Sequence, residues 1–148
     1  MSDPFVHLRV ASGYSMRYGA SLPHRLVERA SDHGMDVLAL TDRDGVYGAV
    51  RFVKACQSAG IRPVLGVDLA VRSSFASPLG PGVGSVPGSP LGLERTRQRT
   101  PVRGGAEVDL RHPRVTLLAQ GGRGWASLCR LVSATHLGGE RGAPVSSL

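Results

Sequence analysis

The chain has 148 residues, the usual size of one domain, and 41% of them are apolar, which is normal for a globular protein. Its net charge of +7 comes from 18 basic residues that include a single Lys; this bias is typical of a GC-rich genome and is compatible with a polyanion such as DNA. No apolar run approaches the ~20 residues of a membrane span. The N-terminus also lacks a signal sequence, so we expect a cytoplasmic protein without a membrane partner.

The first part of the chain begins with a strand pattern and a helix pattern. Residues 5–10 alternate in polarity and predict a strand. After a polar loop, Ser21 is a candidate N-cap and Pro23 occupies the first turn of a helix, where its missing N–H costs little. Gly34 follows the last apolar residue of this helix, as a helix-ending glycine does.

The same alternation then repeats. Residues 37–41 form an apolar run typical of a strand covered on both faces. A second helix over about residues 46–59 ends at Gly60, and residues 63–71 predict another strand. This order predicts an α/β fold with a parallel sheet or part of a barrel. We expect Cys56, and Cys129 further on, to be buried free thiols on helix faces.

The character of the sequence changes after this unit. Residues 73–105 are rich in Pro, Gly and Ser without hydrophobic periodicity, which predicts a disordered insert. Its arginines favour a solvated linker, with a DNA-contacting arm as the alternative; they are Arg95, Arg97, Arg99 and Arg103.

Order resumes after the insert. Residues 114–119 predict a fourth strand, residues 121–124 a turn, and a helix runs from Trp125 to about His136. A Gly-rich tail follows. The expected organisation is therefore a strand–helix unit over 1–72, the insert over 73–105, a strand and helix over 106–137, and a flexible tail over 138–148.

Several short motifs occur in a specific order. They are His-Leu-x-x-x-Ser-x-Tyr-Ser at 7–15, Gly-Ala-Ser at 19–21, Ala-Leu-Thr-Asp at 39–42, Ala-Gly-Ile-Arg-Pro-Val-Leu-Gly-Val at 59–67 and Leu-Cys-Arg-Leu-Val-Ser at 128–133. With these motifs the chain resembles the PHP domain (polymerase and histidinol phosphatase type) at the N-terminus of the bacterial DNA polymerase III alpha subunit and its error-prone relatives. The resemblance implies an irregular seven-stranded (β/α) barrel, of which this chain would supply about four parallel strands with flanking helices.

The resemblance also implies a metal site at the strand ends, where polar residues follow apolar runs. Metal-binding members use His, Asp and Glu, which suit Zn or Mn. The corresponding positions here are His7, Arg9, Ala11, Asp42, Arg43 and Asp68. A guanidinium cannot ligate a metal. We therefore expect a vestigial site with no metal cofactor and no catalytic residue, in which the two arginines could pair with the two aspartates.

Simpler interpretations of the same residues stay open. His7 could be a core histidine, and residues 42–45 could be a turn with an Asp N-cap for the next helix. Tyr14, Ser15 and Tyr18 could pack under a loop. Trp125 is most simply an anchor on a helix face.

The resemblance implies a structural, non-catalytic part of a DNA polymerase III alpha-type subunit of the error-prone class, acting in DNA replication or translesion repair. The implied partners are the rest of the polymerase chain, a proofreading or clamp subunit, and DNA through the parent polymerase. The alternative from another class is a free-standing metal-dependent phosphoesterase of the PHP family. A truncated or decayed gene product is the third possibility.

Overall fold

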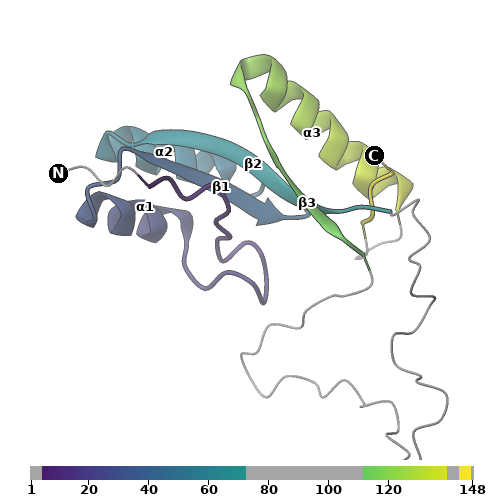
Figure 1. The fold of residues 1–148 in the computed structure, drawn as a ribbon, viewed down its shortest axis with the longest axis horizontal. Helices are drawn as coiled ribbons and strands as arrows, with labels where there is room; N and C mark the ends of the chain where they lie inside the picture. Colours follow the sequence, from purple (N-terminus) through teal and green to yellow (C-terminus); the bar gives the residue numbers. More distant parts are fainter. Residues whose placement is uncertain (1–4, 73–111, 140–143, 148) are drawn as a thin grey trace, which may run out of the picture.

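The computed structural model describes residues 5–72, 112–139 and 144–147. This part of the chain forms three helices and one three-stranded sheet with the strand order β1-β2-β3 (Figure 1). Within it, no helix combines the length and the apolar character needed to cross a membrane. The helices are α1 (Pro23–Asp32), α2 (Ala49–Ala59) and α3 (Gly121–Gly138), and the strands are β1 (Val37–Arg43), β2 (Arg62–Ala70) and β3 (Arg114–Leu118).

The central pair of strands confirms the predicted parallel unit. Val37 of β1 lies opposite Arg62 of β2, and the parallel register continues to the pair of Arg43 and Asp68. Because parallel strands need a crossover connection, α2 carries the chain from the end of β1 back to the start of β2. This register brings the last residues of both strands to one edge of the sheet.

The prediction of about four parallel strands is wrong for β3, which is the predicted fourth strand. β3 runs antiparallel to β2, with Arg114 opposite Ala70 and Leu118 opposite Gly66. It then leads directly into α3, which runs back along it (Figure 1). The chain therefore re-enters the sheet at the end where β2 leaves it, without the crossover that a parallel partner needs.

Residues 5–10 do not form the predicted strand, although they run beside β1 (Figure 1). The N–H of Ala39 donates to the carbonyl of His7 at 3.0 Å, and the N–H of Thr41 donates to the carbonyl of Val10 at 2.8 Å. In return, the N–H of Val10 donates to the side-chain Oγ1 of Thr41 at 3.0 Å. A side-chain hydroxyl thus takes the place of a backbone carbonyl as acceptor, so the regular backbone hydrogen bonding of a strand is interrupted here.

The predicted C-terminal ends of the first two helices are confirmed, whereas the predicted helix starts differ from the observed ones. Gly34 has φ of 67° and Gly60 has φ of 71°, the left-handed conformation that glycine adopts without strain. The Ser21 N-cap is wrong, because α1 begins at Pro23 with Leu22 before it and no side-chain cap. Helix α3 begins at Gly121, so the predicted turn over residues 121–124 is helical.

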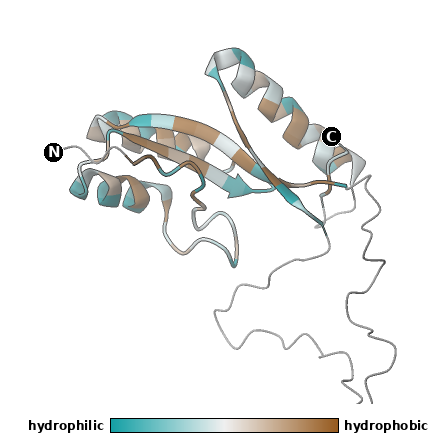
Figure 2. Ribbon diagram, viewed as in Figure 1, coloured by the Kyte–Doolittle hydropathy of each residue, from teal (hydrophilic) through white to brown (hydrophobic). Residues whose placement is uncertain are grey.

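The two faces of the sheet have different surroundings, since successive residues of a strand point to opposite faces. On one side, here called the helix-covered face, Leu38 and Leu40 pack with Phe52 and other residues of α1 and α2. Val67 and Leu69 pack on the same side against α3, where Trp125 contributes as predicted. Figure 2 shows hydrophobic residues along the strands and hydrophilic ones on the outer sides of the helices. The opposite side, here called the pocket face, carries polar side chains.

The two remaining predictions concern the insert and the tail. The predicted insert over residues 73–105 lies outside the described residues. In the tail, which we expected to be flexible, Ser146 is buried and forms a parallel bridge with Val71. The N–H of Ser146 donates to the carbonyl of Ala70 at 2.8 Å, and the N–H of Arg72 donates to the carbonyl of Ser146 at 2.8 Å. This part of the tail therefore extends the pairing at the end of β2.

Candidate functional site

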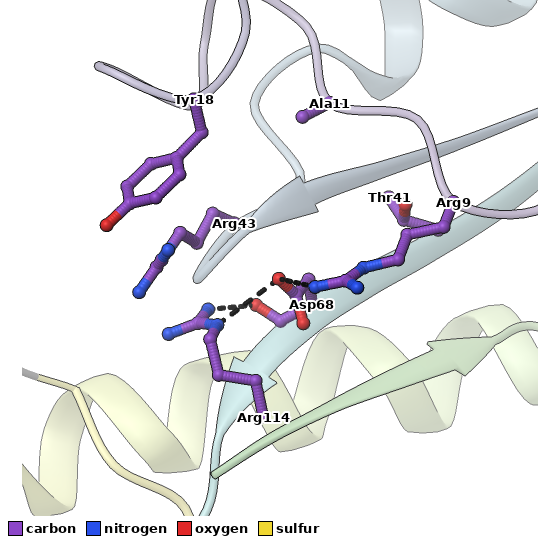
Figure 3. Close-up of a pocket in the computed structure, with 7 residues that line it drawn as sticks. All are labelled: Arg9, Ala11, Tyr18, Thr41, Arg43, Asp68 and Arg114. Carbon is purple, nitrogen blue, oxygen red and sulfur yellow. Dashed lines mark hydrogen bonds and ion pairs between the residues drawn. The ribbon is translucent and has the colours of Figure 1, made fainter. Parts of the chain in front are cut away.

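A pocket of about 730 Å³ opens on the pocket face at the strand ends (Figure 3). The structure brings four of the six predicted site positions together there, namely Arg9, Ala11, Arg43 and Asp68. The other two, His7 and Asp42, do not line it. The complete lining comprises Arg9, Ala11, Tyr18, Thr41, Arg43, Asp68 and Arg114.

Asp42 lies on the helix-covered face, one residue before Arg43 and therefore on the other side of the strand. Its side chain is almost completely buried, with 2% of the residue exposed. Oδ1 accepts hydrogen bonds from the Ser12 N–H at 2.7 Å and from the Ser15 hydroxyl at 2.7 Å, and the Ser12 hydroxyl lies 2.9 Å from both carboxylate oxygens. Asp42 thus fixes the loop that follows residue 11.

This loop is held from several directions. The N–H of Arg43 donates to the Ser15 hydroxyl oxygen at 2.8 Å, so the same serine joins the loop to the end of β1. At Gly19 a side chain is excluded, because a Cβ atom would lie 2.0 Å from the carbonyl oxygen of Ser12. Of the three residues that could pack under a loop, Ser15 is buried, and its partner is the carboxylate that the resemblance placed in a metal site. Tyr18 is 36% exposed and lines the pocket.

His7 occupies neither of its two predicted environments. Its side chain is exposed, and its ring meets the ring of Phe5 edge-on with 4.8 Å between centroids. It is neither a pocket residue nor a core histidine.

The pocket is organised by Arg114, which the sequence analysis did not single out. Its side chain is only 12% exposed. Nη2 donates to Asp44 Oδ1 at 2.8 Å and to the carbonyl of Asp68 at 2.5 Å, while Nε donates to Asp68 Oδ2 at 3.2 Å. One guanidinium from β3 therefore ties together the ends of β1 and β2, which is the fork geometry that arginine provides and lysine does not.

Asp44 lies in the turn after β1, within the segment that could have supplied an Asp N-cap for the next helix. It is not an N-cap, because α2 begins only at Ala49 with Gly48 before it. Its backbone adopts a positive φ of 55°, a conformation uncommon outside glycine. Its N–H donates to the carbonyl of Asp68 at 2.9 Å, and its own carbonyl contacts Nε2 of His136 in α3. Asp44 is thus a tight corner that contacts β2, β3 and α3.

The other two arginines make weaker contacts. Nη2 of Arg9 lies 3.5 Å from Asp68 Oδ2, one of the two aspartates with which the arginines were expected to pair, but the Arg9 side chain is 70% exposed. Nε of Arg43 lies 3.8 Å from Asp44 Oδ2, so the ion pair of Arg43 among the described residues is with neither of the two expected aspartates. The Arg43 guanidinium instead stacks over the Tyr18 ring at 3.7 Å (Figure 3).

The residues at this site do not fit a divalent metal. Among the described residues, no three His, Cys, Asp or Glu side chains converge. Asp42 is saturated by serine donors on the opposite face, and Asp68 is held by Arg114. The buried Oδ1 of Asp68 has no hydrogen-bond donor among the described residues. The three guanidinium groups around it repel a divalent cation, and the nearby carboxylates are too few to outweigh that repulsion.

The sequence matches the PHP domain family over residues 7–146. It is 36% identical over 144 residues to the error-prone DNA polymerase of Mycobacterium bovis, a match that covers 97% of this chain and 11% of that protein. It is 35% identical over 136 residues to the error-prone DNA polymerase of Symbiobacterium thermophilum, covering 92% of this chain and 9% of that protein.

Solved structures give a shorter match. The structure of an amidohydrolase from Chromobacterium violaceum matches 47% of this chain and 24% of that one, with 30% identity and a TM-score of 0.44. The chain spans about a tenth of the length of the two polymerases. Because the family match runs through nearly all of the sequence, the chain belongs to the PHP domain family.

Proposed function

We propose that this chain is the N-terminal PHP portion of an error-prone DNA polymerase and that it supports the polymerase structurally in DNA replication or translesion repair. The similarity to the N-terminal regions of such polymerases supports the parentage. On this proposal the chain works in the cytoplasm, and its principal partner is the remainder of the polymerase. A proofreading or clamp subunit is the second partner class.

One observation carries the non-catalytic role. The strand-end pocket, where a metal-dependent enzyme needs ligands, is cross-linked by Arg114 to Asp44 and Asp68. Activation of water for phosphoester hydrolysis requires a Lewis acid or a free general base. Arg114 pairs with both carboxylates that could serve either purpose, and the one buried Asp68 oxygen without a donor lies among guanidinium groups, so the site supports a structural role better than hydrolysis.

Exposed apolar side chains support the view that this is part of a larger barrel. Val50 and Tyr47 near the start of α2 are 67% and 70% exposed, and Leu118 at the end of β3 is also exposed. An open sheet leaves edges that a closed barrel removes. The remainder of the polymerase would cover these side chains and supply the missing strands.

The parentage is tested by complementation. The matching region is removed from the error-prone polymerase of M. bovis, and this chain is added as a separate polypeptide. We expect the two to co-elute in size-exclusion chromatography and the chain to raise the melting temperature of the truncated polymerase. Failure to associate would contradict the structural role.

The absence of catalysis is tested by metal analysis. After dialysis against Zn and Mn, we expect well under one ion per chain and no hydrolysis of a phosphoester substrate. A matched variant carrying Arg9→His, Ala11→His and Arg43→His should bind more metal, because it restores imidazoles at the positions where the family has them. Stoichiometric metal and phosphoester hydrolysis in the unmodified chain would favour the free-standing phosphoesterase instead.

A further inference from the structure

Helix α2 has a buried side and an exposed side with different chemistry. Phe52 and Cys56 on the buried side pack in the helix-covered core and are 0% exposed. Residues three or four positions apart lie on the same side of a helix. By this spacing the opposite side collects four exposed side chains, the first of them from the turn just before the helix. They form the surface here called the α2 outer face, which comprises Tyr47, Val50, Arg51 and Lys54.

The α2 outer face carries two positive charges without a compensating carboxylate. The 11 residues of α2 include no Asp and no Glu. Among the described residues, neither Arg51 nor Lys54 forms an ion pair, whereas Arg25 on the neighbouring helix α1 pairs with Glu28 at 2.8 Å. The two charges of α2 therefore remain available to a partner.

Two tyrosine rings at the start of α2 are held in place by glycines. A Cβ atom at the buried Gly45 would overlap the Tyr47 ring, so this ring lies against the Gly45 backbone although Tyr47 is 70% exposed. The ring of Tyr14 lies equally close to Gly48, and the guanidinium carbon of Arg51 is 5.9 Å from its centroid, within the range of a cation–π contact. Side chains that are ordered before binding lose less entropy when a partner arrives.

The mixture of side chains on this face suits a protein partner better than a nucleic acid. Val50 lies one helical turn after Tyr47 and one turn before Lys54, and it is 67% exposed. Exposed apolar side chains bordered by charges are the arrangement of a protein interface, in which tyrosine and arginine contribute strongly. A DNA strand carries one negative charge per nucleotide, so it needs a longer row of cations than Arg51 and Lys54 provide.

We infer that the α2 outer face is the docking site of an acidic amphipathic helix. Its apolar side chains would pack on Tyr47 and Val50, and its carboxylates would pair with Arg51 and Lys54, because a helix repeats its side chains at the same spacing of three to four residues. The docking helix is expected to be a segment of the parent polymerase, and this choice of source rests on the proposed function.

Fluorescence anisotropy of a labelled peptide tests the chemistry of this face. The probe is a short helical peptide that carries Leu and Glu at intervals of three to four residues on one face and Ala elsewhere. The controls are the same peptide with Lys in place of Glu and a single-stranded oligo-dT. We expect the chain to bind the acidic peptide, less tightly as salt is added. The basic peptide should not bind, and oligo-dT should bind more weakly.

Matched variants locate the contact. Arg51→Glu with Lys54→Glu should weaken binding of the acidic peptide by about tenfold or more, because attraction becomes repulsion. Val50→Ala should weaken it by about fivefold to tenfold through the lost apolar contact. The control is Arg123→Glu with Arg130→Glu, the same charge change at two exposed positions of α3, which should alter binding by less than about twofold. Circular dichroism spectra check the fold of each variant.

Three results of the titration would overturn the inference. They are no binding of the acidic peptide, equal binding of the basic peptide, and an equal loss in the α2 and α3 double variants. Tighter binding of oligo-dT than of the acidic peptide would overturn it as well and would assign the face to nucleic acid.

The truncated M. bovis polymerase separates this inference from the proposed function. The unmodified chain should associate with it, and the Arg51→Glu, Lys54→Glu variant should associate at least about tenfold more weakly. Equal association of both would contradict the docking site and leave the structural role intact. Failure of the unmodified chain to associate would contradict the structural role and the source of the docking helix, while the peptide titration still decides the chemistry of the face.

Discussion

Two aspartates at the same edge of the sheet have opposite surroundings. Asp42 points to the helix-covered face, is buried, and is surrounded by the neutral donors of Ser12 and Ser15. Asp68 points to the pocket face, has arginine partners, and keeps one oxygen without a donor among the described residues. The two carboxylates differ by one step along the strand register, since Asp68 lies opposite Arg43.

The difference lies in the kind of hydrogen-bond donor that surrounds each carboxylate. Neutral hydroxyl and N–H donors satisfy a buried carboxylate without adding charge, so the Asp42 contacts hold a loop and leave nothing for a ligand. Guanidinium donors around Asp68 carry more hydrogen-bonding capacity than two carboxylates use. The helix-covered face therefore stabilises the fold, and the arginines of the pocket face retain unused N–H donors.

The largest effect should follow from removing the Asp42 carboxylate. Asp42→Ala leaves three buried donors from Ser12 and Ser15 without an acceptor, and we expect a loss of roughly 3–5 kcal/mol in the free energy of unfolding. Urea denaturation measures it. Asp42→Asn, which keeps one acceptor oxygen, should lose about half as much. A loss below about 1 kcal/mol for the alanine variant would show that the loop is held by other contacts.

Removal of Arg114 should have the next largest effect. Arg114→Met leaves Asp44 and Asp68 without their closest cation, at an expected cost of about 2–3 kcal/mol, because both carboxylates still reach water at the pocket edge. Arg114→Lys should recover only part, since an ammonium cannot bridge both partners. Arg9→Gln, at an exposed site, should cost below about 0.5 kcal/mol and serves as the control in the same urea titration.

Removal of a single hydroxyl on the helix-covered face should cost less stability than removal of the Asp42 carboxylate or of Arg114. Ser15→Ala removes one hydrogen bond to Asp42 and the acceptor for the Arg43 N–H, with an expected loss of about 1–2 kcal/mol. Ser58→Ala is a suitable control, because its exposed hydroxyl only donates to a carbonyl within α2. Thermal unfolding of both variants distinguishes the two positions. Equal melting temperatures would contradict the anchoring role of Ser15.

The smallest expected effect is a pH dependence of stability that arises from a thiol buried away from water in the helix-covered core. Cys56 is fully buried there, and burial raises the pKa of its thiol to about 11. Below the unfolded pKa the thiol is neutral in both states and the full stability is present. As pH rises from about 9 towards 11, the unfolded thiol ionises first and stability falls.

Melting temperatures across this alkaline range test the Cys56 prediction. We expect those of the unmodified chain to fall more steeply than those of Cys56→Ala. The thiol reagent DTNB should label the less buried Cys129 before Cys56. Labelling in the opposite order would show that water reaches this core.

The parallel unit could be predicted because its signals are local. The apolar run of β1, the two helix-ending glycines and the second strand each depend on near neighbours in sequence. The direction of β3 could not be predicted, because it depends on where the chain re-enters the sheet. If β3 were parallel, Arg114 would lie at the opposite end of the sheet. The role of Arg114 in the pocket was therefore not predicted.

The site positions were predicted only in part for a similar reason. The family resemblance named Arg9, Arg43 and Asp68, which line one pocket. It also named Asp42, which lies beside Arg43 in sequence and therefore points to the opposite face of the strand. The serine partners of Asp42 lie about thirty positions away, and no local pattern links them to it.

The junction between β2 and β3 has a consequence for how this family can diverge. The N–H of Val71 donates to the carbonyl of Pro113 at 2.9 Å, so the two ends of the intervening stretch meet at one backbone hydrogen bond. The entropy of closing a loop grows only slowly with its length. We therefore expect insertions and deletions between these two residues to leave the sheet register and the pocket unchanged, so this junction is a point where related proteins could gain or lose whole segments.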